Sequence, residues 1–409
     1  MDILAKLKIL GAAAKYDVCA ATGSRGSGSG RSGLLNPAGA GVCHSFTPDG
    51  RCISLFRVLM TNICQNDCAY CPNRAQRDLP RVSFAPAELA ALFMEFFRRN
   101  YVEGLFLSSG VAVSPSRTME NMLRTVEILR LKYKYRGYIH LKILPGLSYD
   151  YIQRAAEVAS RVSVNIEAPN ALRMNKLSRL KDFKTGIINR MRWINQIQKN
   201  GSSLPAGHTT QFIVGAAGES DAEILRTAVG LYQQVGLRRA YYSAFQPVPD
   251  TPLESVSPAP LIREHRLYQT DFLLRQYKFS LDEIPFSGEG NLPTDVDPKM
   301  ASAINNIHRF PLEINKASYG ELLRVPGIGM LSASRIIQVR RRFQISSLAE
   351  LKNIGIVVKR ASPFILINGK TQANLRLYEQ LSLWSDADAG FMHLKSRFPD
   401  QSSPFIPGV

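Results

Sequence analysis

The stretch FRVLMTNICQNDCAYC, residues 56–71, joins an apolar run typical of a buried strand to three closely spaced cysteines. These are Cys64, Cys68 and Cys71, in the spacing Cys-x3-Cys-x2-Cys. Three thiolates on one loop can ligate three irons of a 4Fe-4S cube and leave the fourth iron open to a small molecule. A structural zinc site would need a fourth ligand, and no second cysteine pair follows downstream. The stretch therefore predicts a strand that ends at an iron-sulfur site.

Strand-like and helix-like segments alternate from this point to residue 245. Apolar runs at 56–62, 104–109, 139–144, 162–167, 209–215 and 240–245 are separated by helical patterns at 88–99, 121–132, 151–159, 187–198 and 222–234. This spacing is typical of repeated βαβ units and a parallel sheet. The sequence predicts an α/β fold, a partial (β/α)6 TIM-like barrel, followed by a small all-α domain.

Composition limits the class of protein. The chain has 409 residues, 45% hydrophobic and 21% charged, which indicates a soluble globular protein of two or three domains. All six cysteines fall within the first 71 residues, a clustering that favours metal binding over disulfides in a reducing compartment. No apolar run is long enough for a transmembrane helix and the start does not fit a secretory signal, so we expect a cytoplasmic protein without a membrane partner.

Breaks in composition divide the chain into five predicted parts. These are a cysteine-containing extension with a Gly/Ser loop (1–56), the barrel (57–256), a helix with a Pro/Gly linker (257–296), a helix-hairpin-helix domain (297–378) and a C-terminal tail (379–409).

The C-terminal motif is ELLRVPGIGMLSASRII, residues 321–337, an apolar helix, a Val-Pro-Gly-Ile-Gly turn and a second helix. Two glycines allow close approach of a phosphate, and amides at a helix start can donate to it. Between residues 313 and 378 there are eleven Lys and Arg against three Glu, and the whole chain has a net charge of +18. We predict a nucleic-acid-binding surface, with DNA favoured, formed by Gly327, Ile328, Gly329, Arg335, Arg340 and Arg341.

Two further features extend this prediction. Residues 348–361 echo the motif, but Val357 stands where the first copy has Gly329, so the second copy is expected to be a packing partner. Residues 173–199 contain eight cations and one acid, including Lys176, Arg179 and Lys181, and could guide a polyanion toward the barrel mouth. For the charge run of the C-terminal part, a solvated helix face is the usual alternative, but beside the paired motif a surface that binds the phosphate backbone is favoured.

The cysteine motif with Tyr70 before its last cysteine resembles the radical S-adenosylmethionine (SAM) superfamily, whose hallmark is Cys-x3-Cys-x-aromatic-Cys after the first barrel strand. The resemblance implies a 4Fe-4S cluster on Cys64, Cys68 and Cys71, bound SAM, and cleavage of SAM by one electron to a 5′-deoxyadenosyl radical. It also places Tyr70 near the adenine.

Other predicted SAM-binding residues lie at the ends of later strands. Ser108, Ser109 and Gly110 stand where the superfamily usually has Gly-Gly-Glu, so here the methionyl amino group would meet hydroxyls or backbone carbonyls. Ser163, Asn165 and Glu167 alternate along the fourth strand and would share its inner face, which suits ribose hydroxyls and the methionyl group. A buried structural network is the alternative for these three.

Cys19, Cys43 and Cys52 are not explained by one cluster. They could hold an auxiliary iron-sulfur cluster or a zinc ion, or be ordinary small buried residues.

Along nearly its full length, the chain resembles a bacterial group of radical SAM proteins assigned to DNA modification or repair. That resemblance implies a partner similar to uracil-DNA glycosylase, and the cofactor implies a reductase, flavodoxin or ferredoxin as electron donor. We therefore expect a radical SAM enzyme that acts on nucleic acid, in DNA modification or repair. Two alternatives stay open: modification of RNA or of a protein partner, and a non-enzymatic DNA-binding protein with a structural or redox-sensing cluster.

Overall fold

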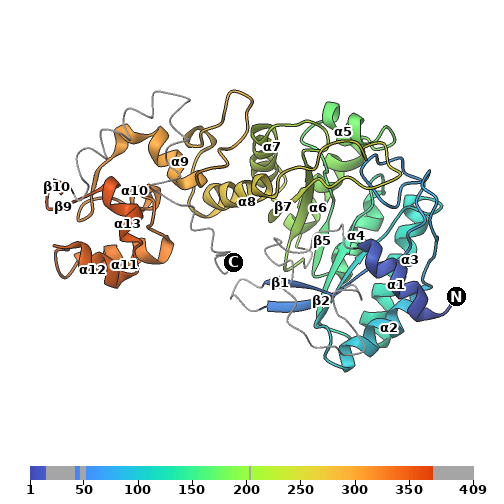
Figure 1. Cartoon of the computed structure of the whole chain (residues 1–409). Helices are drawn as coiled ribbons and strands as arrows, with labels where there is room; N and C mark the ends of the chain where they lie inside the picture. Colours follow the sequence, from blue (N-terminus) through green and yellow to red (C-terminus); the bar gives the residue numbers. More distant parts are fainter. Residues whose placement is uncertain (15–41, 47–51, 202–203, 372–409) are drawn as a thin grey trace. The chain divides into compact units, whose positions relative to one another are not determined.

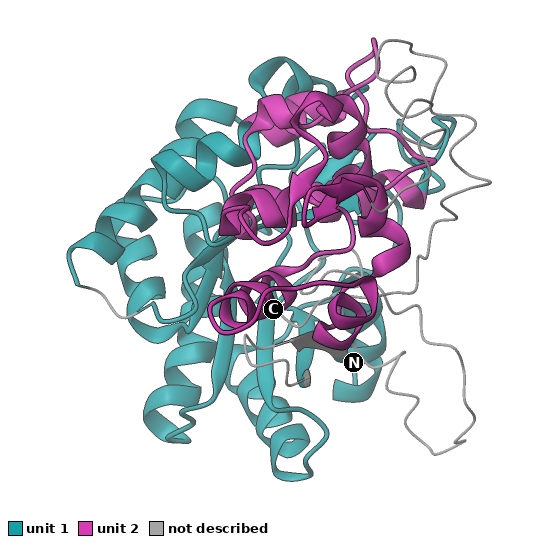
Figure 2. Ribbon diagram, turned by 90° about the vertical axis from the view of Figure 1, so that its left-hand side faces the viewer, with its two compact units in different colours: residues 1–219, 227–260, 404–409 teal, residues 220–226, 261–403 magenta. Residues whose placement is uncertain are grey.

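The computed structural model describes residues 1–14, 42–46, 52–201 and 204–371. They form two compact units (Figure 2): residues 1–219 and 227–260 make up the first, and residues 220–226 and 261–371 the second. The Gly/Ser loop, Cys19 and the tail from residue 379 lie outside the described residues.

The first unit is built on a seven-stranded sheet whose strands follow one another in chain order (Figure 1). Strands β2 to β7 are parallel, and β1 pairs antiparallel with β2. β1 and β7 lie at the two ends of this order, so the sheet is an open, curled half-barrel, which confirms the predicted α/β parallel architecture. The strands are β1 (Val42–Phe46), β2 (Cys52–Leu59), β3 (Gly104–Ser108), β4 (Tyr138–Lys142), β5 (Arg161–Ser163), β6 (His208–Val214) and β7 (Arg239–Ala244).

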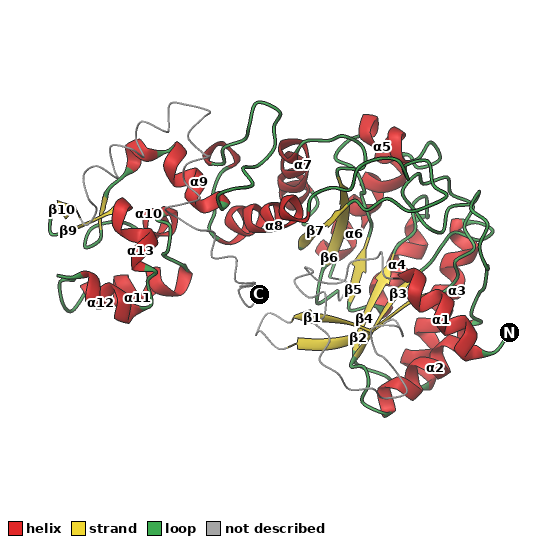
Figure 3. Cartoon of the chain, in the orientation of Figure 1, coloured by secondary structure: helices red, strands yellow, loops and turns green. Residues whose placement is uncertain are grey.

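Helices cover the outer face of this sheet (Figure 3). Along the chain, α2 contacts α3, α3 contacts α4, and α4 contacts α6. Each buries one apolar face; in α2 that face includes Leu89 and Phe93. The helical segments are α1 (Ile3–Ala13), α2 (Pro86–Arg98), α3 (Pro115–Glu127), η2 (Ile128–Lys132), α4 (Tyr149–Val158), α5 (Ala171–Leu177), η3 (Phe183–Ile188) and α6 (Asn189–Lys199). Helix α7 (Asp221–Gln234) begins in the second unit and continues into the first.

The first unit differs from expectation in three places. Residues 1–56, predicted as a separate extension, contribute α1, β1 and the start of β2, and Lys6 of α1 forms an ion pair of 2.8 Å with Glu88 of α2. The loop after β5 contains the unexpected helix α5. Strand β5 ends at Ser163, four residues short of the predicted 162–167 strand.

The second unit is mainly helical around its own apolar core, which includes Ile314, Leu322, Ile336 and Phe364. Its segments are α8 (Leu261–Gln276), η4 (Leu281–Glu283), α9 (Pro298–Asn305), η5 (Ile307–Arg309), β8 (Leu312–Glu313), α10 (Tyr319–Arg324), α11 (Met330–Arg340), α12 (Leu348–Ile354), α13 (Val358–Ala361), η6 (Ser362–Phe364), β9 (Ile365–Ile367) and β10 (Lys370–Thr371).

The prediction that this unit is all-α is wrong, because β10, β9 and β8 form a small sheet. β9 and β10 are joined through Asn368 and Gly369, both at positive φ (54° and 74°). Asn-Gly is the pair that best adopts this mirror-image turn, and the turn holds the two strands in a hairpin.

Candidate active site

The loop that carries Cys64, Cys68 and Cys71 leaves the carboxyl end of β2. All three thiols are free of disulfides and line one cavity of about 240 Å³ in the first unit. Backbone N–H groups donate to two of the sulfurs at 3.4 Å, Val111 to Cys64 Sγ and Asn73 to Cys71 Sγ. Such donors stabilise a thiolate more than a thiol.

Arg81 closes the cysteine loop from one side. Its guanidinium donates to four backbone carbonyl oxygens of the loop and the turn that follows it, those of Asn62, Asn73, Arg74 and Arg77. A planar fork with five N–H donors can satisfy several carbonyls at once, which a lysine cannot do. One side chain thus fixes the path of the chain around the cysteines.

Asp67, between the first two cysteines, fixes the loop from the other side. Its carboxylate accepts hydrogen bonds from Ser178 Oγ (2.5 Å) and from the backbone N–H of Arg179 (3.0 Å). The N–H of Ala69 donates to the carbonyl of Leu177 at 2.7 Å. The segment after β5 is therefore part of the wall that shapes the cysteine site.

That segment also brings a buried lysine to the thiols. Lys181 Nζ lies 3.4 Å from Glu167 Oε1 and 3.5 Å from Tyr70 Oη, and only 11% of its side chain is exposed. Burial alone would lower the pKa of Lys181, but Cys68 and Glu167 raise it above its usual value. Sequence reasoning assigned Lys181 to a polyanion-guiding stripe, whereas the structure places its ammonium in the cysteine cavity.

The thiols themselves lie in a medium that disfavours charge. Burial raises the pKa of Cys68, and it raises the pKa of Cys71 to about 12. Thiolate ligands at these positions therefore need positive charge close by. Lys181 supplies one such charge, and a bound metal cluster would supply more.

The donor set fits a three-cysteine cluster. Among the described residues, no three His, Cys, Asp or Glu side chains are grouped so that they could hold a single metal ion. A 4Fe-4S cube does not need such convergence, because each of its irons takes its own thiolate.

Polar atoms without partners lie in the same cavity. Ser108, Ser109 and Glu167 all line it, and Ser108 Oγ, Ser109 Oγ and Glu167 Oε2 are buried with no hydrogen-bond partner within the described parts of the chain. Unpaired buried polar atoms cost free energy unless a ligand satisfies them. The cavity therefore suits a polar ligand such as the methionyl end of SAM.

Gly110 allows the loops after β2 and β3 to touch. Its N–H donates to the carbonyl of Thr61 at 2.8 Å, and a Cβ at this position would lie 2.5 Å from Ile63 O and 3.2 Å from Cys64 Cβ. The glycine is thus needed for close approach to the cysteine loop, and it lines the cavity as predicted for a cofactor-binding residue.

The polar stripe predicted for Ser163, Asn165 and Glu167, on and after β5, is only partly present. Asn165 and Glu167 line the cavity, but Ser163 is not among its lining residues. Beyond Ser163, Thr210 Oγ1 accepts from the N–H of Ile166 (3.0 Å) in place of a regular ladder bond, and Glu167 turns to φ +62°. The regular strand therefore ends at Ser163, and of the three residues only Asn165 and Glu167 line the cavity.

The predicted phosphate-binding turn of the second unit lies between α10 and α11. Gly327 has φ +85°, and a Cβ there would lie 2.6 Å from Val357 O. The N–H of Val357 donates to Gly327 O at 3.1 Å, so the second copy of the motif packs on the first. Gly329 precedes the first residue of α11, and the side chain of Ile328 is buried in the core.

The predicted arginines differ in their surroundings. Arg340 donates to the carbonyls of Ile314 (3.0 Å) and Ala317 (2.6 Å), so its guanidinium ties α11 to the segment before α10. Arg335 is exposed and donates to the carbonyl of Ile354 at 3.1 Å. Arg341 is exposed and has no hydrogen-bond or ion-pair partner among the residues that the structure describes.

Two of the remaining cysteines lie on the antiparallel pair at the edge of the sheet. The register places Cys43 opposite Leu55 and Cys52 opposite Phe46. An auxiliary metal on Cys19, Cys43 and Cys52 stays a prediction.

In the described ranges, no helix has the length and apolar character needed to cross a membrane.

Comparison with known families decides the class of this site. Residues 58–229, from β2 into α7, match the family model of the radical SAM superfamily. The chain contains a radical SAM domain. No curated protein matches the chain. Cys64, Cys68 and Cys71 all lie inside the matched residues, so the cysteine site belongs to this radical SAM domain.

Three solved structures show partial similarity to this chain. The FeFe-hydrogenase maturase HydG from Carboxydothermus hydrogenoformans is 15% identical over 53% of this chain and 50% of its own, with a TM-score of 0.43. Methylornithine synthase (PylB) is 16% identical over 51% and 60%, with a TM-score of 0.42. The methyltransferase TsrM from Kitasatospora setae is 13% identical over 51% and 38%, with a TM-score of 0.37. The chain thus spans about half the length of the solved proteins it matches.

Proposed function

We propose that this radical SAM enzyme acts on nucleic acid, and specifically on DNA in a modification or repair reaction. The observation that carries the proposal is the α10–turn–α11 unit, in which Gly327 permits a tight turn and α11 begins directly after Gly329. We interpret this unit as a helix-hairpin-helix. Backbone amides at such a helix start are suited to a phosphate oxygen.

The second unit also carries exposed cations. They lie on or beside α11, α12 and α13 and include Arg335, Arg341, Arg342, Lys352 and Lys359. A surface of this kind binds the phosphate backbone regardless of base sequence. Specificity must then come from the first unit, where the cofactor cavity lies.

In the first unit, we propose that Cys64, Cys68 and Cys71 hold the 4Fe-4S cluster and that Ser108, Ser109 and Glu167 hold the methionyl group of SAM. When bound, the cluster supplies the electron for reductive cleavage of SAM. The ammonium of Lys181 balances the negative charge of the thiolates, and Tyr70, next to Lys181, forms part of the wall of the cysteine cavity. The reaction needs an electron donor, for which we propose a reductase, flavodoxin or ferredoxin in the cytoplasm, where thiols stay reduced.

Binding to DNA tests the first part of the proposal. We would compare wild-type protein with a variant in which Arg335, Arg341 and Arg342 are replaced by Gln, using fluorescence anisotropy of labelled duplex DNA over a range of salt concentrations. If each arginine meets one phosphate, the slope of log affinity against log salt falls by about 3. The matched control replaces three exposed arginines of the first unit, Arg98, Arg99 and Arg136, and removes the same charge.

An equal loss in both variants would reduce the effect to net charge and overturn the proposal. Tighter binding of RNA than of DNA at matched salt would favour the RNA alternative. Chemistry is tested by chromatography of 5′-deoxyadenosine formed from SAM under anaerobic reduction, with and without DNA. A triple Ala variant of Cys64, Cys68 and Cys71 should form none.

The auxiliary metal site and the protein partner are tested separately. Iron and zinc retained by that triple Ala variant would indicate the auxiliary site proposed for Cys19, Cys43 and Cys52. Co-purification with a protein similar to uracil-DNA glycosylase would establish the partner that the sequence resemblance implies.

A further inference from the structure

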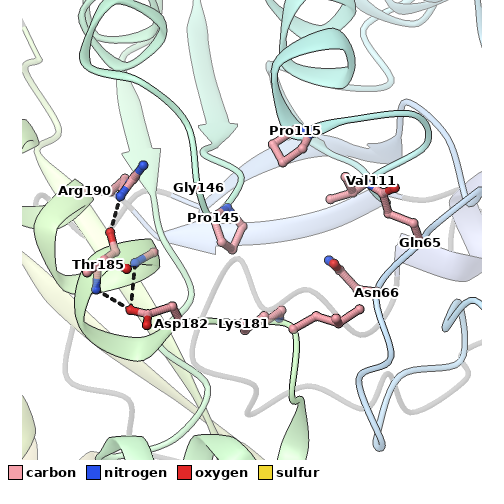
Figure 4. A pocket seen from close by; sticks show the side chains of 12 residues that line it. Gln65, Asn66, Val111, Pro115, Pro145, Gly146, Lys181, Asp182, Thr185 and Arg190 are labelled. Atoms are coloured by element: carbon pink, nitrogen blue, oxygen red, sulfur yellow. Dashed lines mark hydrogen bonds between the residues drawn. The ribbon is translucent and has the colours of Figure 1, made fainter.

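A second cavity of about 480 Å³ lies in the first unit beside the cofactor cavity (Figure 4). It opens among the loops that follow β2, β3, β4 and β5, which is the end of a parallel barrel where substrates bind. Its volume lies within the range of pockets that take small ligands and cofactors. None of the roles proposed above for SAM or the cluster uses this space.

Two amide side chains face this cavity without a partner. Gln65 and Asn66 line it, and neither side chain forms a hydrogen bond within the residues that the structure describes. A carboxamide offers donors and an acceptor side by side. This is the pattern that reads the hydrogen-bonding edge of a nucleobase.

The other lining residues include apolar side chains and a cation. Pro115, Pro145 and Val111 present flat or branched apolar surfaces, against which a planar ring can pack. Arg190 is held at the rim by the carbonyls of Leu147 (2.8 Å) and Thr185, leaving its charge at the cavity. A ligand with a planar polar ring and an anionic group would match these surfaces.

The one carboxylate of this cavity is already engaged. Asp182 accepts the backbone N–H groups of Thr185 and Gly186 at the start of η3. A hydrogen bond from the Thr185 hydroxyl and those from these two N–H groups lower the pKa of Asp182, which caps the start of η3. Asp182 and Arg190 are both anchored to Thr185, so this carboxylate lies beside the cation that would take an anionic ligand group.

The two cavities share a wall. Asn66, Val111, Pro145 and Lys181 line both of them. A ligand in the second cavity would therefore lie next to bound SAM, which is the position that a substrate requires.

We propose that this second cavity binds one unstacked nucleotide of the DNA substrate, with its base toward Gln65 and Asn66 and its phosphate toward Arg190. The inference rests on the proposed function, because it names the part of the nucleic acid that enters the barrel end. To reach such a site, a nucleotide of duplex DNA must separate from its partner base and leave the base stack.

Trp193 provides a reporter at the site. It lies 4.8 Å from the guanidinium of Arg190, and Trp384 is the only other tryptophan of the chain. In the full-length holoprotein carrying Trp384→Phe, we would titrate each of the four deoxynucleoside monophosphates and follow Trp193 fluorescence, with saturating SAM present throughout. A saturable change with at least one nucleotide is expected.

The Gln65→Leu variant removes the amide and keeps a side chain of similar size. Gln65 lines only the second cavity, so loss of its hydrogen bonds should weaken nucleotide binding by about tenfold. The matched control is Gln233→Leu, an exposed glutamine of α7 outside both cavities, for which affinity should be unchanged.

Three results would overturn the proposal: no saturable signal, equal affinity in wild type and Gln65→Leu, or binding that appears only when SAM is left out. DNA anisotropy on the same samples separates the two proposals. Protein that binds DNA but no nucleotide refutes the nucleotide cavity alone. Protein that binds a nucleotide but no DNA refutes the proposed function alone.

Discussion

Replacing Gly110 by Ala should loosen the cysteine loop without touching a cysteine. The added Cβ would lie 2.5 Å from Ile63 O, whereas real Cβ contacts essentially never fall below 3.0 Å, so the carbonyl must retreat by at least 0.5 Å (3.0 minus 2.5). The neighbouring atom is backbone and cannot rotate away. Overpacking of this kind costs about 1–3 kcal/mol. Because Cys64 follows Ile63, the shift is passed directly to the first ligand.

The assay has two readouts, the melting temperature of the apoprotein and the iron content per chain after anaerobic reconstitution. A loss of about 2 kcal/mol lowers the melting temperature by on the order of 5 °C in a domain of this size. Gly230→Ala is the control. Nothing lies within 4 Å of a Cβ at this position, and alanine is more stable than glycine in the interior of a helix such as α7. Gly110→Ala protein that melts like wild type and loads the same iron would refute the reasoning.

The other predictions concern the surroundings of the site and the core. Arg81→Lys should lower stability by about 3 kcal/mol and reduce iron retention, because a lysine cannot serve four carbonyls; unchanged urea unfolding would contradict this. Lys181→Gln should make the cluster's reduction potential more negative in a potentiometric EPR titration, since a positive charge beside the thiolates is lost, while exposed Lys184→Gln should leave it unchanged. Burial lowers the pKa of His208 to about 4, so the unfolded chain, with a pKa near 6.5, takes up the proton first as pH falls. Stability should therefore drop by roughly 3 kcal/mol between pH 6.5 and 4 in chemical unfolding, and His208→Gln should abolish that part of the pH dependence.

The order of strands and helices could be predicted because the spacing of apolar residues within each short segment indicates a strand or a helix. β3 and β6 are buried along their whole length; β3 is a short apolar run and β6 ends in one, and the helices between them show one apolar face. β1 was missed, because it is short and pairs antiparallel at the edge of the sheet. The hairpin at Asn368 and Gly369 carried a clear local signal that the helical pattern around it obscured.

The cysteine site was predictable from its spacing, but its surroundings were not. Lys181 meets Tyr70 across 111 positions of the chain, and Asp67 meets Ser178 across the same distance. No local pattern marks such contacts, which arise only when the loop after β5 folds over the cysteine loop. Likewise, the end of β5 at Ser163 depends on Thr210 of the neighbouring strand rather than on the residues of β5 itself.

Glu167 has a consequence for engineering this enzyme. Its backbone is held at φ +62°, between a hydrogen bond to Gln211 O and one from the N–H of Ile213, in a conformation that costs a non-glycine residue roughly 1–2 kcal/mol. Its second carboxylate oxygen adds the cost of an unpaired buried group. Laboratory evolution for heat resistance should nevertheless retain this glutamate, because glycine or asparagine there would relieve the backbone but leave the buried Lys181 ammonium without its carboxylate partner.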